Sequence, residues 1–305
     1  RGVMGYRQGV ALVIGAGILW SFMGLIVRQI DGAGAVSVVF WRSAGMAPVI
    51  LGFLILRRGR GTWASLRATG MAGVIAGLGI SLAYLGAIYA LQATTVANAV
   101  FLFSAAPFFS AVLGRVVLGE RVSSWTWAAM ALAGLGIFVM IGGSLGGVSL
   151  GGGGRMDGNL AALASAFGFA VFTVALRSGR IGDMMPANLL GAGLSMLAAA
   201  LLAPALGQTL AASPRDIAIA MAMGAVVLAG GMILFTFGSR RLPAAEATLF
   251  SSVENILAPV WVWALLGETA TLNTLIGGAM VLGAVILNAY RGALGATLAG
   301  RRAIG

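Results

Sequence analysis

Apolar residues run through this chain in long, nearly uninterrupted stretches, and polar residues gather in the short segments between them. Ten such stretches can be delimited, at residues 8–27, 35–56, 69–91, 95–118, 124–142, 159–177, 187–206, 216–238, 243–266 and 271–290. Each is close to the roughly 20 residues that an α-helix needs to cross the hydrocarbon layer of a bilayer. We therefore predict an all-α integral membrane protein with ten transmembrane helices.

The composition supports a lipid environment. Of the 305 residues, 60% are hydrophobic and only 9% are charged, whereas a soluble domain has about 25% charged residues. The chain contains neither Cys nor His, which removes disulfides, thiolate chemistry, most zinc sites and the usual proton shuttle. We expect no metal and no cofactor. The first stretch, with Arg1 and Arg7 ahead of it, resembles a signal peptide, but nine similar stretches follow, and an uncleaved span is the simpler interpretation.

The net charge of +11 comes from arginine, and its distribution predicts the topology. With the N-terminus in the cytoplasm, fourteen arginines fall in cytoplasmic segments, at positions 1, 7, 57, 58, 60, 67, 121, 177, 180, 240, 241, 291, 301 and 302. Only Arg28, Arg155 and Arg215 fall outside. Because positive charge favours the cytoplasmic side, we predict that both termini are cytoplasmic. Topology then accounts for the basic charge, and no nucleic-acid partner is expected.

Two parts of the chain repeat. Residues 94–120 align with 242–268, and each segment ends in Gly-Glu; residues 20–28 lie loosely over 169–177, and each of these ends in Arg. Each half contains five predicted spans. Because five is odd, the second half enters the membrane from the opposite side, which predicts two inverted five-helix repeats.

The repeat divides the chain into three parts. The first half covers 1–142, a Gly-rich linker on the outer face covers 143–157, and the second half covers 158–305. The sequence GGSLGGVSLGGGG predicts a flexible connection. It has no Lys and no following soluble helix, so a phosphate-binding loop is not expected.

With ten spans, inverted halves and a Gly-Glu closing spans 4 and 9, the chain resembles the EamA-type branch of the drug/metabolite transporter superfamily. Trp20 and the sequence FWR (40–42) also fit that branch. Within it, the chain is most similar to bacterial exporters of amino acids, aromatic ones included. The resemblance implies an inner-membrane carrier with a central cavity between the halves. The second half departs from the pattern, because position 191, roughly opposite Arg42, is Gly.

Two ionisable residues within the spans are candidate substrate contacts. Glu254, followed by Asn255, lies near the middle of span 9, where a carboxylate costs about 2.5–3.5 kcal/mol on insertion scales. The alternative is a structural Glu that faces the other half. Arg42 lies about 10 Å deep in span 2 by helical rise. It would pair with Glu254, bind an anionic substrate group, or extend outward to the interface.

Aromatic residues inside the spans suit, as a set, a cavity for an amphipathic molecule, although any single ring is more often a packing residue than a ligand contact. The candidates are Trp20, Tyr84, Tyr89, Phe101, Phe169 and Phe172. Pro107 and Pro259 lie at nearly equivalent places in spans 4 and 9. Because proline removes a backbone hydrogen bond and kinks a helix, we interpret them as hinges, with a static kink as the alternative.

These features predict a secondary transporter that exports small amphipathic metabolites, amino acids first, by alternating access. The alternative is an exporter of cationic drugs or quaternary ammonium compounds. A membrane enzyme is disfavoured because only two carboxylates lie within spans and no His is present. A channel is disfavoured because no selectivity-filter segment is visible. The expected partners are a small-molecule substrate and the lipid bilayer, and the carrier is expected to be a monomer.

Overall fold

The computed structural model describes residues 2–145, 155–242, 247 and 250–302, and all regular structure in these ranges is helical. The first half forms α1 (Gly2–Val27), α2 (Ala35–Arg58), α3 (Gly61–Arg67), α4 (Gly70–Ala93), α5 (Val96–Phe103), α6 (Ala106–Leu118) and α7 (Ser124–Leu145). The second half forms α8 (Met156–Ser178), α9 (Met185–Ala205), α10 (Pro214–Ala222), the π-helix η1 (Met223–Gly230), α11 (Gly231–Ser239), α13 (Val253–Leu266) and α14 (Leu272–Arg302). Most of the predicted linker 143–157 and most of the start of predicted span 9 lie outside the described residues.

Within the described residues, seven helical segments are long and apolar enough to cross a membrane. They are Gly5–Val27, Ala35–Arg58, Gly70–Ala93, Val96–Leu118, Met156–Ser178, Met185–Ala205 and Pro214–Ser239. Three shorter apolar helices cover Ser124–Met140, Val253–Leu266 and Leu272–Asn288. A multi-pass helical membrane protein is therefore confirmed. That all ten helices cross as two inverted repeats stays a prediction.

Predicted span 4 (95–118) matches the candidate span Val96–Leu118, but it is divided into two helices, which the sequence did not indicate. A turn at Ser104 and Ala105 separates α5 from α6. The Ser104 hydroxyl donates to the Val100 carbonyl at 3.1 Å. Pro107 lies in the first turn of α6, where a missing N–H costs nothing because that donor has no intrahelical partner. Pro107 therefore helps to start a helix rather than kinking one.

Predicted span 9 is interrupted at the matching place. Ser252, the repeat equivalent of Ser104, is a turn residue just before α13. The helix then continues through Pro259 to Leu266. The two prolines thus occupy different helical positions, and the irregularity that the halves share lies at the two serines. Glu254 consequently lies in the first turn of α13 instead of in the middle of a continuous span.

Predicted span 8 contains the π-helix η1 between α10 and α11, which the sequence analysis did not predict. Here the chain meets α2 backbone to backbone. A Cβ added to Gly224 of η1 would overlap the carbonyl oxygen of Arg42 and lie 2.8 Å from its carbonyl carbon. A Cβ on Gly45 of α2 would likewise lie 2.7 Å from the carbonyl carbon of Met221. Only glycine permits this approach, and π-helical turns are frequent at functional sites.

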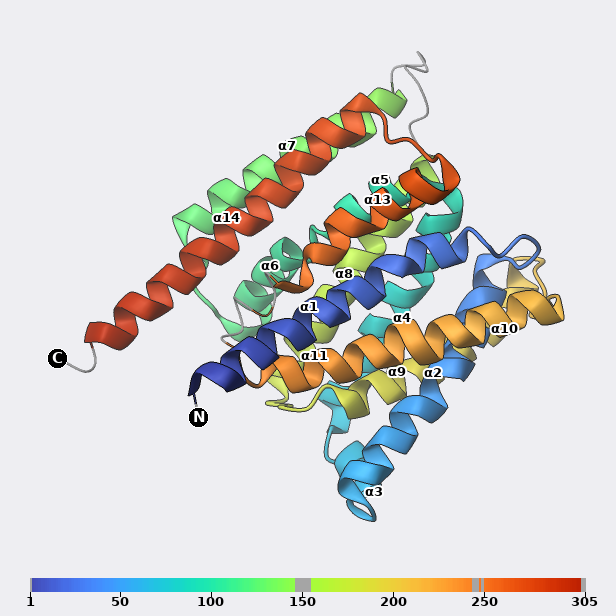
Figure 1. Cartoon of the computed structure of the whole chain (residues 1–305), viewed down its shortest axis with the longest axis horizontal. Coiled ribbons are helices and arrows are strands. Elements are labelled where there is room, and N and C mark those ends of the chain that lie inside the picture. Colours follow the sequence, from blue (N-terminus) through green and yellow to red (C-terminus); the bar gives the residue numbers. More distant parts are fainter. Residues whose placement is uncertain (1, 146–154, 243–246, 248–249, 303–305) are drawn as a thin grey trace.

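Helices from the two halves pack against each other along most of the molecule. Figure 1 shows α7 and α14 side by side along one edge, where a Cβ on Gly136 would lie 2.6 Å from the carbonyl oxygen of Gly277. In the interior, α4 packs on α8, and a Cβ on Gly168 would lie 2.7 Å from the amide nitrogen of Ala83. Small residues at such seams let helices approach closely within a membrane.

Candidate functional site

Arg42 of α2 is fully buried, at 0% exposure. Its guanidinium lies over the Tyr84 ring of α4, with 4.3 Å from Cζ to the ring centroid. Its three side-chain nitrogens have no hydrogen-bond partner in the described part of the chain. An unpaired buried charge costs several kcal/mol, and a desolvated cation–π contact returns only about 2 kcal/mol. Arg42 therefore keeps unused capacity to bind an anionic group.

Tyr84 links Arg42 to the second half of the chain. Its hydroxyl donates to Oδ1 of Asn188 on α9 at 3.1 Å. The amide nitrogen of the same Asn188 side chain donates to the Met184 carbonyl at 3.0 Å, which fixes the orientation of the amide. The neighbouring hydroxyl of Ser43 is buried and has no partner among the described residues. Polar groups from α2, α4 and α9 thus meet in an otherwise apolar interior.

Trp20 of α1 borders the same interior region. Its indole ring packs on Gly231 of α11, where a Cβ would lie 2.7 Å from Cδ1, and lies 5.7 Å from the Phe235 ring. Its Nε1 is buried without a partner in the described ranges. Trp20 packs against the hydrophobic cluster that contains Tyr84 and Phe172. Three residues predicted from the sequence, Trp20, Tyr84 and Phe172, therefore lie in or against one hydrophobic cluster, and Arg42 is joined to it by its contact with Tyr84.

Glu254 and Asn255 are partly buried in the first turn of α13, where a carboxylate interacts favourably with the helix dipole. This segment abuts α1 at Gly17, one helical turn from Trp20. No ion pair joins Glu254 to Arg42 among the described residues. This corrects the pairing considered from the sequence and leaves Arg42 without a counter-charge.

The remaining predicted aromatic residues lie elsewhere. Phe101 is buried in α5 against Gly278 of α14. Tyr89 is 37% exposed near the end of α4, where its hydroxyl donates to Oδ2 of Asp157 at 2.8 Å. Neither residue joins the interior region around Arg42. Phe169 is 45% exposed and lines a separate cavity.

This cavity, of about 510 Å³, lies between α6, α7, α8 and α14. Its volume falls in the usual range for small-molecule sites. The wall combines apolar, hydroxyl and charged side chains. It is formed by Pro107, Ser110, Ala111, Glu120, Arg121, Val122, Ser123, Thr126, Phe169, Thr173, Arg177 and Asn288. Across it, the hydroxyls of Ser110 and Thr173 lie 3.0 Å apart and join α6 to α8.

An ion pair spans the rim of the cavity. Nη1 of Arg177, in the last turn of α8, donates to both carboxylate oxygens of Glu120 at 3.0 Å. Both side chains are nearly half exposed, at 47% and 43%. Glu120 follows Gly119, which ends α6 in the left-handed conformation at φ +68°. We call this region the Arg177 end of the bundle.

A second ion pair lies at the opposite end, where α1 ends, and we call that region the Arg28 end. Nε of Arg28 donates to Oε2 of Glu268 at 2.7 Å. Arg28 also donates to the carbonyls of Leu91 and Thr94. Oε1 of Glu268 accepts from the amide of Val96 at 2.6 Å. This pair is less exposed, at 24% and 19%, and is held by more hydrogen bonds than its counterpart.

The two ion pairs use the same positions of the repeat. Arg28 and Arg177 both close the segments that align in the sequence, and both glutamates follow a Gly that caps its helix at φ +68°. Each pair joins one half of the chain to the other. These residues align in the sequence repeat, but their pairing across the halves appears only in the folded chain.

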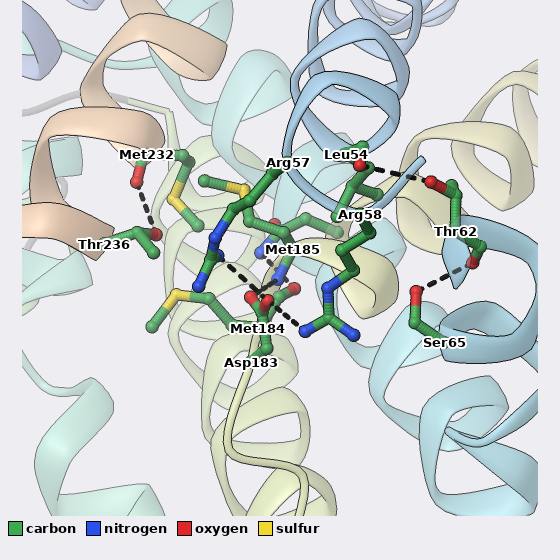
Figure 2. A network of polar contacts seen from close by, with 11 residues as sticks. Leu54, Arg57, Arg58, Thr62, Ser65, Asp183, Met184, Met185, Met232 and Thr236 are labelled. Atoms are coloured by element: carbon green, nitrogen blue, oxygen red, sulfur yellow. Dashed lines mark hydrogen bonds and ion pairs between the residues drawn. The ribbon is translucent and has the colours of Figure 1, made fainter. Parts of the chain in front are cut away.

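A third polar link ties α2 to α9 near the Arg177 end, as Figure 2 shows. Asp183 accepts from Arg58 at 2.7 Å and from Arg57 at 3.2 Å. Its other oxygen accepts from the amide of Met185 at 3.1 Å and so caps the start of α9. Asp183 is only 11% exposed. None of these residues lines the cavity.

Comparison with known proteins supplies the family. Residues 7–142 and 156–290 each match the EamA-like transporter family. The chain belongs to this family. The EamA-like transporter is also similar to an uncharacterized transporter of Archaeoglobus fulgidus, with 26% identity over 283 residues, 92% of this chain and 96% of the relative. A solved crystal structure covers 92% of the EamA-like transporter at 18% identity, with a TM-score of 0.63 and 97% of its own chain matched. This last likeness concerns the fold alone.

Proposed function

We propose that this EamA-like transporter is a secondary carrier that exports small amphipathic metabolites, amino acids first, across a bacterial inner membrane by alternating access. With both termini in the cytoplasm, the Arg177 end faces inward and the Arg28 end faces outward. The inverted repeat supplies the mechanism, because two halves of like fold can exchange inward-open and outward-open arrangements around a central site.

Several paired features support two related halves. The family model matches the chain twice, once on each side of the linker. The turns at Ser104 and Ser252 interrupt equivalent spans, and discontinuous helices are typical of transporter binding sites. Pro107 lies in the first turn of α6, two residues after the break at Ser104 and Ala105, which suits it to a hinge role. Pro259 remains the weaker hinge candidate because its helix is continuous.

The unpaired guanidinium of Arg42 is the observation that carries the proposed substrate class. It favours a substrate with an anionic group, because a carboxylate would supply the missing counter-charge and charge-assisted hydrogen bonds. Tyr84, Trp20 and Phe172 offer rings for an apolar side chain. Glu254 and Asn255 would contact an ammonium group, and Phe169 would line the route from the cytoplasm. An amino acid has all three groups that these contacts require: a carboxylate, an apolar side chain and an ammonium group.

A cationic drug is the second candidate, and Glu254 is the feature that favours it. A quaternary ammonium compound without an anionic group would bring a second positive charge near Arg42. In a medium of low dielectric constant that repulsion is strong. The charge of Arg42 should therefore favour binding of an amino acid and oppose binding of a cationic drug.

Uptake into proteoliposomes separates these candidates. Labelled L-phenylalanine would be compared with phenethylamine, which lacks the carboxylate, and with tetraphenylphosphonium. The variants are Arg42→Gln and, as a matched control at an exposed site, Arg115→Gln. Charge-assisted hydrogen bonds are worth about 1.5–3 kcal/mol each, so Arg42→Gln should reduce phenylalanine uptake at least about tenfold. Equal uptake of the amine, with no effect of Arg42→Gln, would exclude the amino-acid assignment and leave the cation candidate.

A further inference from the structure

The ion pairs Arg28–Glu268 and Arg177–Glu120 lie at opposite ends of the bundle, at equivalent positions of the repeat. Each crosses a seam between the halves, α1 with α13 at one end and α8 with α6 at the other. We infer that the two pairs are alternating latches: each holds its own end of the transporter shut and breaks when that end opens. The four side chains are thus positioning residues of the transport cycle. This inference rests on the proposed function, because it assumes that the two ends open in turn.

The Arg28 end is closed in this structure well beyond the ion pair. Further along the seam, Nε1 of Trp261 donates to the Ser21 hydroxyl at 2.9 Å. The rings of Phe22 and Trp261 stack with centroids 5.1 Å apart. Ser21 is only 1% exposed. The α1–α13 seam is therefore sealed for about two helical turns below the Arg28–Glu268 pair.

At the Arg177 end, the equivalent ion pair lies over the cavity. Arg177 and Glu120 border the cavity of about 510 Å³, and beneath them only the Ser110–Thr173 contact joins α6 to α8 among the polar contacts of the described residues. The two latches are thus in different situations. Both seams are packed, since the Phe109 and Phe167 rings also meet T-shaped between α6 and α8 with centroids 5.9 Å apart, but of the two pairs only Arg177–Glu120 borders the cavity.

The exposure and the hydrogen bonds of each ion pair predict how strongly it favours the closed state of its own end. An exposed ion pair is weak, so loss of Arg177–Glu120 should favour opening of that end by about two- to fivefold. The Arg28–Glu268 pair is more buried, and Glu268 also accepts from the Val96 amide of the other half, a charge-assisted bond that is roughly twice as strong as a neutral one. The bonds from Arg28 to the Leu91 and Thr94 carbonyls lie within its own half and hold the guanidinium in place. Loss of the pair should shift the population toward an open Arg28 end by at least about tenfold.

Asp183 provides a matched control at the Arg177 end. It also forms ion pairs across the halves, with Arg57 and Arg58 of α2 (Figure 2), but none of these residues lines the cavity. Removal of its charge should weaken the protein without opening the cavity. The substitution Asp183→Asn therefore separates a latch from any ion pair that merely stabilises the fold.

Accessibility of single cysteines tests the inference. The chain has no natural Cys, so Ser21→Cys reports the Arg28 end and Ser110→Cys reports the cavity without background labelling. The purified transporter in proteoliposomes would be treated with a membrane-impermeant thiol reagent from either side. Each reporter is combined in turn with Glu268→Gln, Glu120→Gln and Asp183→Asn.

We expect changes in opposite directions. Glu268→Gln should raise labelling of Ser21→Cys at least about tenfold and lower labelling of Ser110→Cys. Glu120→Gln should raise labelling of Ser110→Cys about two- to fivefold without raising that of Ser21→Cys. Asp183→Asn should leave both rates within about twofold, because Asp183 lies neither on the cavity nor on the α1–α13 seam and so acts independently of both reporters.

Equal increases at both reporters in either glutamine variant would overturn the inference, because they would indicate general loosening. So would unchanged labelling in both. The exchange of Arg177→Glu with Glu120→Arg provides a second test if a glutamine variant does not fold. It should restore the rate for Ser110→Cys to within about twofold of the parent, and failure to do so would count against the latch. Labelling requires no substrate, so an error in the proposed substrate class would not affect this result.

Discussion

The close approach of α2 to the α10–η1 segment makes a sharp prediction for Gly45. A Cβ at this position would overlap the Met221 carbonyl and lie 2.7 Å from its carbon. That is about 0.8 Å closer than the ~3.5 Å at which two carbons make favourable contact. Because the obstacle is backbone, it cannot rotate away, so the helices must separate. Overpacking of this kind costs about 1–3 kcal/mol.

Gly52 is a matched control on the same helix, because a Cβ there would meet nothing within 4 Å. Replacing a helical Gly by Ala gains up to about 1 kcal/mol of helix propensity at both sites. We therefore expect Gly45→Ala to lower the free energy of unfolding by about 1 kcal/mol after that gain is subtracted and Gly52→Ala to raise it slightly. Reversible unfolding in mixed detergent micelles measures both.

The same substitution should also affect transport. Arg42 lies one turn before Gly45 on α2, and its guanidinium lies 4.3 Å from the centroid of the Tyr84 ring. Separation of α2 from η1 would displace that group, so Gly45→Ala should reduce phenylalanine uptake while Gly52→Ala should not. If both variants proved equally stable and equally active, the backbone contact would not position Arg42.

Two further predictions concern other parts of the molecule. Gly119→Ala and Gly267→Ala should each destabilise the transporter by about 1 kcal/mol in the same unfolding assay, because both positions are left-handed at φ +68°. An effect confined to one of them would show that the two helix caps are not equivalent. In proteoliposomes, Glu254→Gln should abolish any stimulation of uptake by an imposed pH gradient, whereas Asn255→Ala should keep it. A gradient effect that survives in Glu254→Gln would exclude this carboxylate as the proton carrier.

The apolar stretches predicted the helices well, because a continuous apolar run of about 20 residues admits few other structures in a membrane. The interruptions were less visible. Ser104 and Ser252 are ordinary residues in apolar runs, and serine is tolerated inside membrane helices. The π-helix η1 depends on contact with α2, which only the folded chain brings about. Such tertiary effects leave no local pattern in the sequence.

For the site, the sequence identified individual residues better than their partners. Arg42, Tyr84, Trp20 and Phe172 do lie together in the interior, whereas Tyr89 and Phe101 do not. The supposed Arg42–Glu254 pair is not formed. Charge complementarity alone suggested it, and nothing in the sequence specifies which side of a helix faces a given neighbour.

The latch residues illustrate a signal that was present but incomplete. The repeat alignment placed Arg28 over Arg177 and Glu120 over Glu268. Pairing each Arg with the Glu of the opposite half follows only from the way α1 meets α13 and α8 meets α6. Symmetric charges at equivalent repeat positions are therefore worth testing as cross-half pairs in other chains of this kind.

Counterflow in proteoliposomes tests the central claim, that this EamA-like transporter is a carrier with one site exposed alternately to each side. Vesicles loaded with excess unlabelled L-phenylalanine would be diluted into a trace of the labelled compound. A carrier should show a transient accumulation of label above its equilibrium level, which Arg42→Gln abolishes and Arg115→Gln retains. Uptake that rises in proportion to concentration, with no overshoot in the parent protein, would indicate a channel and contradict the account.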